Sequence, residues 1–417
     1  MLTQYILFIL VIQWSFVSSH KKNVCRTFGD YATIQTNKNC WYNPDIDSSP
    51  TVLAKRYGYP MKKYRVTTDD GYILTLFRIP HNGSDINSTR QPVLIQHGIG
   101  ASAVFWMMQG RRSLAFVLAD NGYDVWLSTS RGAGYSRKHT HLTTEDPSYW
   151  NFGLHELAVY DLPANIEFIS NITEQRGKII YIGHSMGTTT SYIYSTVKKN
   201  HAVSNLKALI SLSPVAFLKH FEGWHKLAVA FADIVIPVLQ KIGIHYVGDM
   251  PPLTVLIQSL CGKYPSILLC QALILPVVGI AQEQVKPDLL PLFAKHYPTG
   301  TSLKVLRHFI QIILSGGNFQ YYDYKFDNVV VYNSIRPPIY NVTDISLPVY
   351  LFVGSQDVLA SDRDVDILYA KLNSPGSKTR ASKYIFNFAH NDFFMGADVN
   401  DFYKVLSDVI KTKIGNI

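Results

Sequence analysis

The chain has 417 residues, of which 47% are hydrophobic and 17% charged. This composition excludes an intrinsically disordered protein and is ample for a large hydrophobic core. The formal net charge is +9, but the basic residues are scattered, and no unbroken run of them exceeds a pair such as Lys62-Lys63. The scatter favours an ordinary basic surface, so nucleic acid is not predicted as a partner.

The N-terminal segment has the character of a secretory signal. Residues 1–19 contain no charged side chain, and Tyr5–Val17 is mostly apolar. This apolar run is shorter than the roughly 20 residues that span a bilayer. Although the usual basic start is missing, we predict a signal peptide over 1–19 and a secreted or lysosomal protein. Four N-glycosylation sequons agree with export, with acceptors at Asn82, Asn87, Asn171 and Asn341.

The four cysteines fall into two close pairs, Cys25 with Cys40 and Cys261 with Cys270. In an oxidising compartment the simplest pairing joins each cysteine to its neighbour, although three pairings are possible. No cysteine has a C-x-x-C spacing or a nearby histidine cluster. A metal site is therefore not predicted.

Short apolar runs alternate with helix-length segments in two parts of the chain, and together they indicate an α/β protein. Buried strands separated by helices predict a mostly parallel sheet with helices on both faces. A final stretch with helical spacing, 401–414, is expected to close the fold. The predicted strands cover 93–96, 123–127, 178–182, 208–212, 348–354 and 383–388.

Long apolar stretches interrupt this alternation. Leu227–Leu239 has Asp233 as its only charged residue, and Ser266–Ile280 has no charge at all. Buried helices within an insertion would explain both stretches, and so would a lid or cap that faces a substrate. The predicted domains are an α/β core over 20–213 and 341–417 and a helical cap or lid insertion over 214–340.

The most informative motif is Gly183-His184-Ser185-Met186-Gly187, which lies between an apolar strand and a helix-compatible segment. This is the layout of a nucleophile elbow, in which a sharp turn lifts a serine hydroxyl above the end of a sheet. Side chains at Gly183 or Gly187 would collide with neighbouring backbone in such a turn. The same geometry is expected to direct His184 away from a substrate.

Possible partners for this serine follow it in the order Ser185, Asp357, His390, each at the end of a predicted strand. A serine hydroxyl becomes a good nucleophile when an imidazole takes its proton, and a carboxylate orients that imidazole. We therefore predict these three residues as the catalytic ones. The oxyanion hole is expected from the backbone N–H groups of Met186 and of Ile99, in the loop after the 93–96 strand.

These motifs resemble the acid lipase family of α/β-hydrolases, which includes gastric lipase and lysosomal acid lipase. The resemblance runs from about Tyr59 to Phe394. It implies an α/β-hydrolase fold, no metal or organic cofactor, and cleavage of carboxylic esters of lipids by Ser185, Asp357 and His390. It also implies that Cys261–Cys270 is the family's cap disulfide. Further matching stretches are 68–74, Gln96-His97-Gly98, 118–126, Ser130-Arg131-Gly132, 160–164 and 340–343.

The predicted function is that of a secreted or lysosomal lipase acting on triacylglycerol or cholesteryl ester, in transient contact with a lipid droplet or membrane surface. Two alternatives remain. A broad small-ester hydrolase would share the three catalytic residues but would more often have a short or polar cap. A non-catalytic lipid-binding carrier would usually have lost one of them. No oligomeric state or pH optimum is predicted.

Overall fold

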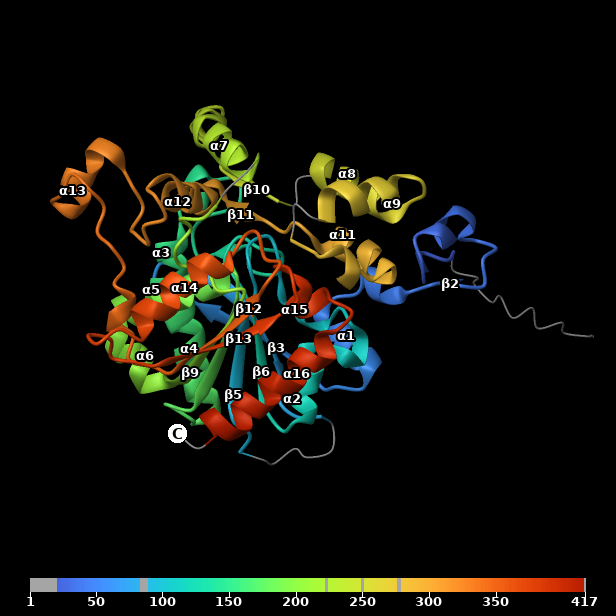
Figure 1. Cartoon of the computed structure of the whole chain (residues 1–417), viewed down its shortest axis with the longest axis horizontal. Helices are drawn as coiled ribbons and strands as arrows, with labels where there is room; N and C mark the ends of the chain where they lie inside the picture. The colour runs from blue at the N-terminus through green and yellow to red at the C-terminus, as the bar shows by residue number, and fades with distance from the viewer. Residues whose placement is uncertain (1–20, 83–88, 222–223, 249–250, 276–278, 416–417) are drawn as a thin grey trace, which may run out of the picture.

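The computed structural model describes residues 21–82, 89–221, 224–248, 251–275 and 279–415 (Figure 1). The predicted signal peptide, 1–19, and the predicted glycan acceptor Asn87 lie outside the described residues. Within the described ranges, no helix is both long enough and apolar enough to cross a membrane.

A nine-stranded sheet forms the centre of the protein, in the order β13-β12-β9-β8-β5-β6-β4-β3, with β7 paired to β4. The run from β13 to β6 is parallel, whereas β3, β4 and β7 add an antiparallel edge. The predicted α/β fold with a mostly parallel sheet is confirmed, while the antiparallel edge was not predicted. The strands are β3 Lys62–Thr67, β4 Tyr72–Ile79, β5 Pro92–Gln96, β6 Asp124–Thr129, β7 Lys138–His139, β8 Ile179–His184, β9 Leu206–Leu212, β12 Val349–Gly354 and β13 Ala381–Phe386.

Helices cover both faces of the sheet, which explains why its central strands are apolar at consecutive positions. In β5, for example, Val93 and Ile95 enter one hydrophobic core and Leu94 enters the other. The first core includes residues of α2 and α16, and the second includes residues of α4, α5 and α14. Helices of the core region are α1 Pro50–Tyr57, α2 Leu114–Asp120, α3 Leu154–Glu156, α4 Leu162–Thr173, α5 Met186–Val197, α6 Lys199–Asn205, α14 Asp362–Leu372, α15 Asp392–Met395 and α16 Val399–Asp408.

Helices of the insertion between β9 and β12 lie together above the sheet in Figure 1. The disulfide Cys261–Cys270 joins α8 to the turn that follows α9. The insertion also contains a small antiparallel pair that was not predicted, β10 Tyr246–Val247 with β11 Thr301–Ser302. The described helices of the insertion are α7 Trp224–Lys241, α8 Pro251–Gly262, α9 Ser266–Leu269, α11 Leu290–His296, α12 Leu303–Leu314 and α13 Asn328–Tyr332.

One face of α7 is apolar and uncovered. Leu227, Phe231, Ile234 and Val238 are between 55% and 75% exposed, and their spacing places them in a single stripe. The opposite face of the helix is buried at Ile236, which packs with residues of α12. Of the two explanations left open for this apolar stretch, buried helices do not account for the stripe, because hydrophobic spacing does not reveal what covers a face.

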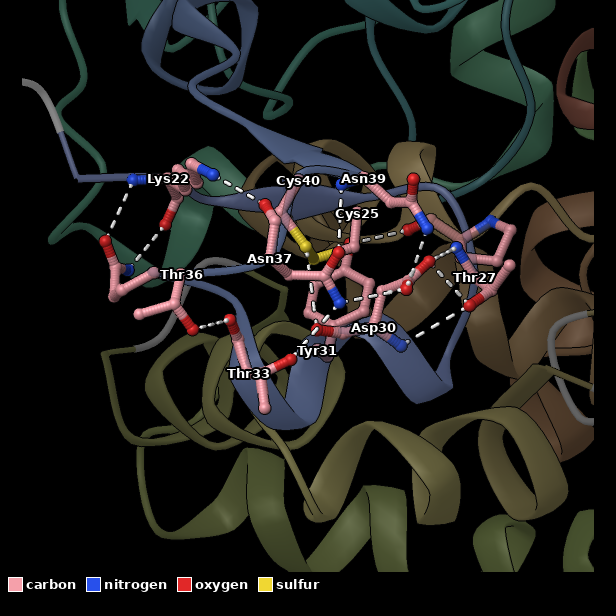
Figure 2. Close-up of a disulfide and its surroundings, with 12 residues drawn as sticks. Lys22, Cys25, Thr27, Asp30, Tyr31, Thr33, Thr36, Asn37, Asn39 and Cys40 are labelled. Atoms are coloured by element: carbon pink, nitrogen blue, oxygen red, sulfur yellow. Dashed lines mark hydrogen bonds between the residues drawn. A yellow bond between two sulfur atoms is a disulfide. The ribbon is translucent and has the colours of Figure 1, made fainter.

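The N-terminal segment forms a small disulfide-linked unit beside the insertion (Figures 1 and 2). Strand β1, Val24–Cys25, pairs with β2, Cys40–Trp41, and a disulfide joins Cys25 to Cys40. The hydroxyl of Tyr31 donates a hydrogen bond of 2.9 Å to the carbonyl oxygen of Pro287. This contact ties the unit to the insertion, just ahead of α11.

Candidate active site

Ser185 occupies a sharp turn between β8 and α5, with φ +52° and ψ −117°. A positive φ is uncommon for a residue with a side chain, and such strain is held only where the surrounding structure enforces it. A Cβ added to Gly183 would lie 2.7 Å from the carbonyl carbon of Gly187, and one added to Gly187 would lie 2.7 Å from the carbonyl oxygen of Gln96. The turn therefore requires glycine at both positions.

The structure brings the side chains of Ser185, His390 and Asp357 together. The Oγ of Ser185 lies 2.7 Å from Nε2 of His390, and Nδ1 of His390 lies 2.8 Å and 3.0 Å from the two carboxylate oxygens of Asp357. With Nδ1–H donating to the carboxylate, Nε2 is left to accept the hydroxyl proton. Asp357 follows β12 and His390 follows β13, so both loops lie at the carboxyl end of the parallel strands.

Asp357 is ionised in spite of its burial. Burial alone would raise the pKa of this carboxyl, but the imidazole of His390 and several hydrogen bonds outweigh it, so the pKa lies below its ordinary value. Two of these bonds come from the backbone N–H groups of Leu359 and Ala360, which donate to Oδ1 over 2.9 Å and 2.8 Å. A charged acceptor facing Nδ1 fixes the orientation of the ring and stabilises its protonated form.

Backbone contacts hold the loop of His390 against the serine turn. The carbonyl oxygen of His390 accepts hydrogen bonds of 2.8 Å from Nε2–H of His184 and from the hydroxyl of Ser213. Burial lowers the pKa of His184 to about 3, so this ring is neutral. His184 is only 2% exposed and its ring is engaged with this carbonyl oxygen, although the residue also lines the cavity beside Ser185.

The loop that contains Ile99 lies directly against Ser185. A Cβ added to Gly98 would come within 3.0 Å of the Cβ of Ser185. Met186, the other residue predicted for an oxyanion hole, begins α5 immediately after the serine. Backbone from two separate segments thus lies close to Ser185, and the oxyanion hole at Ile99 and Met186 stays a prediction.

A cavity of about 290 Å³ opens beside Ser185 and His390. Its wall is mostly aliphatic and aromatic, and its polar groups are concentrated at the serine, so it suits a molecule with one reactive polar centre and an apolar chain. Its lining residues come from the core loops and from the insertion, and the apolar ones are Ile99, Ala101, Phe105, Val215, Leu218, Phe221, Phe293, Tyr297, Phe309, Ile313, Leu359 and Phe394.

Comparisons with known proteins place this site in a family. Residues 51–110 match the model of a partial α/β-hydrolase lipase region, and residues 91–234 match that of the α/β-hydrolase fold. Human lipase member K is 34% identical over 85% of this chain and 88% of its own length. Bovine gastric triacylglycerol lipase is 33% identical over 85% of this chain and 89% of its own. This chain belongs to the acid lipase family.

The membership confirms the predicted resemblance and makes the chain a carboxylic ester hydrolase. A soluble variant of yeast (Saccharomyces cerevisiae) monoglyceride lipase, solved with a substrate analogue, matches with a TM-score of 0.53 and 16% identity. That match covers 85% of this chain and 94% of the yeast protein. At this identity the likeness shows the fold alone, and the fold is that of the α/β-hydrolases.

In this acid lipase, a buried cluster of charged side chains holds the loop at 130–132, which is hydrogen-bonded to the loop that contains Ile99. Arg131, 1% exposed, donates from Nε to Asp161 over 2.7 Å and from Nη2 to Asp70 over 2.9 Å. The neighbouring residue Ser130 donates its backbone N–H to Nε2 of His97 over 3.1 Å. Burial lowers the pKa of His97 to about 4, so its neutral ring is a structural link between this loop and the Ile99 loop.

The sequence motifs did not identify every residue that shapes the site. Ser213 and His184 hold the backbone of His390, yet neither was predicted to do so. The signal for Arg131 was present, since Ser130-Arg131-Gly132 follows a predicted strand directly. Its two acidic partners could not be assigned from spacing, because they lie on separate parts of the chain.

Proposed function

We propose that this acid lipase hydrolyses ester bonds of water-insoluble lipids, such as triacylglycerols or cholesteryl esters, with Ser185 as the nucleophile. The observation that carries the proposal is the hydrogen-bonded line from Ser185 through His390 to Asp357 at the wall of an apolar cavity. A carrier without catalytic activity would have no use for this line of hydrogen bonds.

In the proposed mechanism, Nε2 of His390 takes the proton of Ser185 as the serine oxygen attacks the ester carbonyl carbon. The backbone N–H groups of Ile99 and Met186 stabilise the negative charge that develops on the carbonyl oxygen. His390 then gives the proton to the departing alcohol, which leaves an acyl group on Ser185. Water, deprotonated by His390, attacks this acyl group and releases the fatty acid. Asp357 stabilises the imidazolium in both halves of the reaction.

The exposed stripe of α7 is the surface that we assign to contact with a lipid droplet or membrane. An apolar helix face rimmed by polar residues binds the boundary between lipid and water by burying its side chains there. Phe231 and Ile234, 68% and 70% exposed, lie at the middle of the stripe. The substrate is carried in this phase, so the contact would bring the cavity to its source.

The function is tested by comparing a dispersed short-chain ester with an emulsified long-chain triacylglycerol, for the unmodified protein and for Phe231→Ser combined with Ile234→Ser. Each side chain contributes about 1.5–3 kcal/mol when fully buried. We expect the variant to lose about tenfold or more of its rate on the emulsion while its rate on the dispersed ester changes little.

The control for this test replaces Val197 and Val203, exposed apolar residues of the core region, by serine. It is expected to behave as the unmodified protein on both substrates. Equal losses on the two substrates in the α7 variant would argue against a lipid-binding role for the stripe. Turnover restricted to short esters would favour a broad small-ester hydrolase, and no turnover at all would favour a carrier.

Replacement of Asp357 by asparagine tests the role of the carboxylate. Without the negative charge, the imidazole of His390 loses its orientation and the stabilisation of its protonated form, so kcat is expected to fall by about 10³–10⁴-fold with little change in KM. The measurement is steady-state hydrolysis of a soluble chromogenic ester. Asp362→Asn, at the exposed start of α14, is the matched control. A fall of less than tenfold would contradict the assigned role.

We also propose that the protein enters the secretory pathway through a signal peptide at 1–19 and acts outside the cell or in the lysosome. Asn171 and Asn341 are exposed at the surface, and Asn82 is half-buried. These three and Asn87 are the proposed glycan acceptors. The two disulfides agree with an oxidising compartment.

A further inference from the structure

Asp392 is a fully buried acid close to the catalytic loop, and the proposed mechanism does not use it. Its exposed fraction is 0%, and it begins α15 two residues after His390. Its Oδ2 accepts the backbone N–H of Ala389 over 2.6 Å and that of Ala281 over 3.3 Å. Its Oδ1 has no hydrogen-bond partner among the described residues. Buried polar atoms without partners are rare, so this carboxyl calls for a physical explanation.

The two groups that bind Asp392 belong to segments far apart in the sequence. Ala389 precedes the histidine, whereas Ala281 lies within the insertion, ahead of α11. The backbone N–H of Asn391 also donates to the carbonyl oxygen of Gly279 over 2.7 Å. A Cβ added to Gly279 would lie 2.5 Å from the Cβ of His390, so this segment of the insertion is packed directly on the histidine.

We propose that Asp392 is a positioning residue that joins the 279–283 segment of the insertion to the histidine loop and so holds His390 opposite Ser185. The proposal rests on the assigned role of His390 as the proton carrier. Asp392 does not touch the reacting atoms but acts through the backbone on both sides of the ring. A misplacement of about 1 Å at a catalytic group can cost about 100-fold in rate, so such a link has a measurable effect.

The charge state of this link changes with pH. Burial raises the pKa of Asp392 to about 7, and the negative charges of Glu283 and Asp357 act in the same direction, against the two backbone N–H groups. Glu283 belongs to the same segment of the insertion as Ala281, Asp357 to the loop after β12, and the imidazole of His390 to its own loop. Among the described residues, no cationic side chain forms an ion pair with Asp392.

The sign of the pH effect follows from the raised pKa. The stability that the neutral carboxyl contributes is fully present below its ordinary unfolded pKa of about 4 and is lost as pH rises towards about 7. Above that pH a negative charge without a counter-ion sits between the insertion and the histidine loop. The link is therefore stable in acid and weakened above neutral pH. We expect this weakening to lower kcat at alkaline pH, in addition to any effect of the titration of the catalytic groups.

The experiment measures kcat and KM from pH 4 to 9 on a soluble short-chain ester for Asp392→Asn and Asp392→Ala. Asparagine keeps the oxygen acceptor and imitates the neutral carboxyl, so we expect near-normal kcat in acid and no alkaline fall near pH 7. Alanine removes the acceptor, so we expect kcat to be lower by about 10–100-fold at every pH, with a smaller change in KM.

Two further variants keep the test decisive. Ala281→Pro removes the donor on the insertion side, and the backbone there, with φ −70°, suits proline. The double variant Ala281→Pro with Asp392→Ala should lower kcat no more than Asp392→Ala alone, since both changes break the same link. Asp398→Asn serves as the control and should retain the alkaline fall; Asp398 lies between α15 and α16 and accepts a hydrogen bond from the side chain of Gln284.

A pH profile of Asp392→Asn that superimposes on that of the unmodified protein would overturn the proposal, as would a normal kcat for Asp392→Ala. If the alanine variant does not fold, the asparagine profile and Ala281→Pro decide the question. Loss of the proposed function would show itself separately, as activity that survives Ser185→Ala.

Discussion

Replacement of Ser185 by alanine is expected to lower kcat by about 10⁵-fold or more while leaving the fold intact. The hydroxyl is the proposed nucleophile, and removing one member of such a catalytic unit costs about as much as removing all of them. The hydrogen bond of 2.7 Å to His390 is the main contact that is lost, so stability should change little. The rate is measured with a soluble chromogenic ester and with an emulsified triacylglycerol, and folding by circular dichroism and thermal unfolding.

Ser191→Ala provides the matched control for this variant. Ser191 lies one and a half turns further along α5 and donates its hydroxyl to the carbonyl oxygen of Thr188 over 2.8 Å. It does not line the cavity. We expect Ser191→Ala to leave kcat within about twofold of normal. The loss of one hydrogen bond costs about 1 kcal/mol of stability, and Ser191 contributes no reacting atom. Comparable inactivation by the two variants would place the effect of Ser185→Ala in the fold rather than in the chemistry.

Replacement of Arg131 by methionine is expected to give the largest loss of stability. The change leaves Asp161, which is buried, and Asp70 without their cation. Breaking a buried ion pair from one side typically costs about 3–5 kcal/mol. The measurement is the free energy of unfolding in urea, together with the thermal midpoint, at pH 5 and pH 8.

The pH dependence of this loss separates charge from packing. Burial already raises the pKa of Asp161, and the guanidinium of Arg131 acts against that rise. Without the guanidinium the pKa rises further, so the carboxyl is more often neutral in acid and the penalty should be smaller at pH 5 than at pH 8. Arg176→Met removes an exposed arginine, 48% accessible, and should cost less than about 0.5 kcal/mol. An equal penalty at both pH values would mean that packing, not charge, sets the role of Arg131.

Much of the core could be predicted because its signals are local. The apolar runs at 93–96 and 348–354 correspond to β5, Pro92–Gln96, and β12, Val349–Gly354. The glycines around Ser185 predicted the turn because its sterics involve residues only a few positions apart. Parallel strands bring their carboxyl ends to one edge, and this rule anticipated that Asp357 and His390 would lie near each other.

The rest depends on contacts that spacing does not encode. The bond between Ala281 and Asp392 joins residues 111 positions apart, and it exists only because this segment of the insertion lies beside the histidine loop. The stripe on α7 was equally unpredictable as an exposed surface. An apolar helix face is compatible with a protein core or with a lipid phase, and the sequence pattern is the same for both.

The most direct test of the account is covalent trapping of the active serine by a long-chain alkylphosphonate ester, read by intact mass and by peptide mapping. A phosphonate imitates the tetrahedral intermediate and remains attached to the oxygen that attacks it. We predict one adduct per chain, located on Ser185, and none in Ser185→Ala. An adduct on another residue, or labelling that persists in Ser185→Ala, would contradict the account.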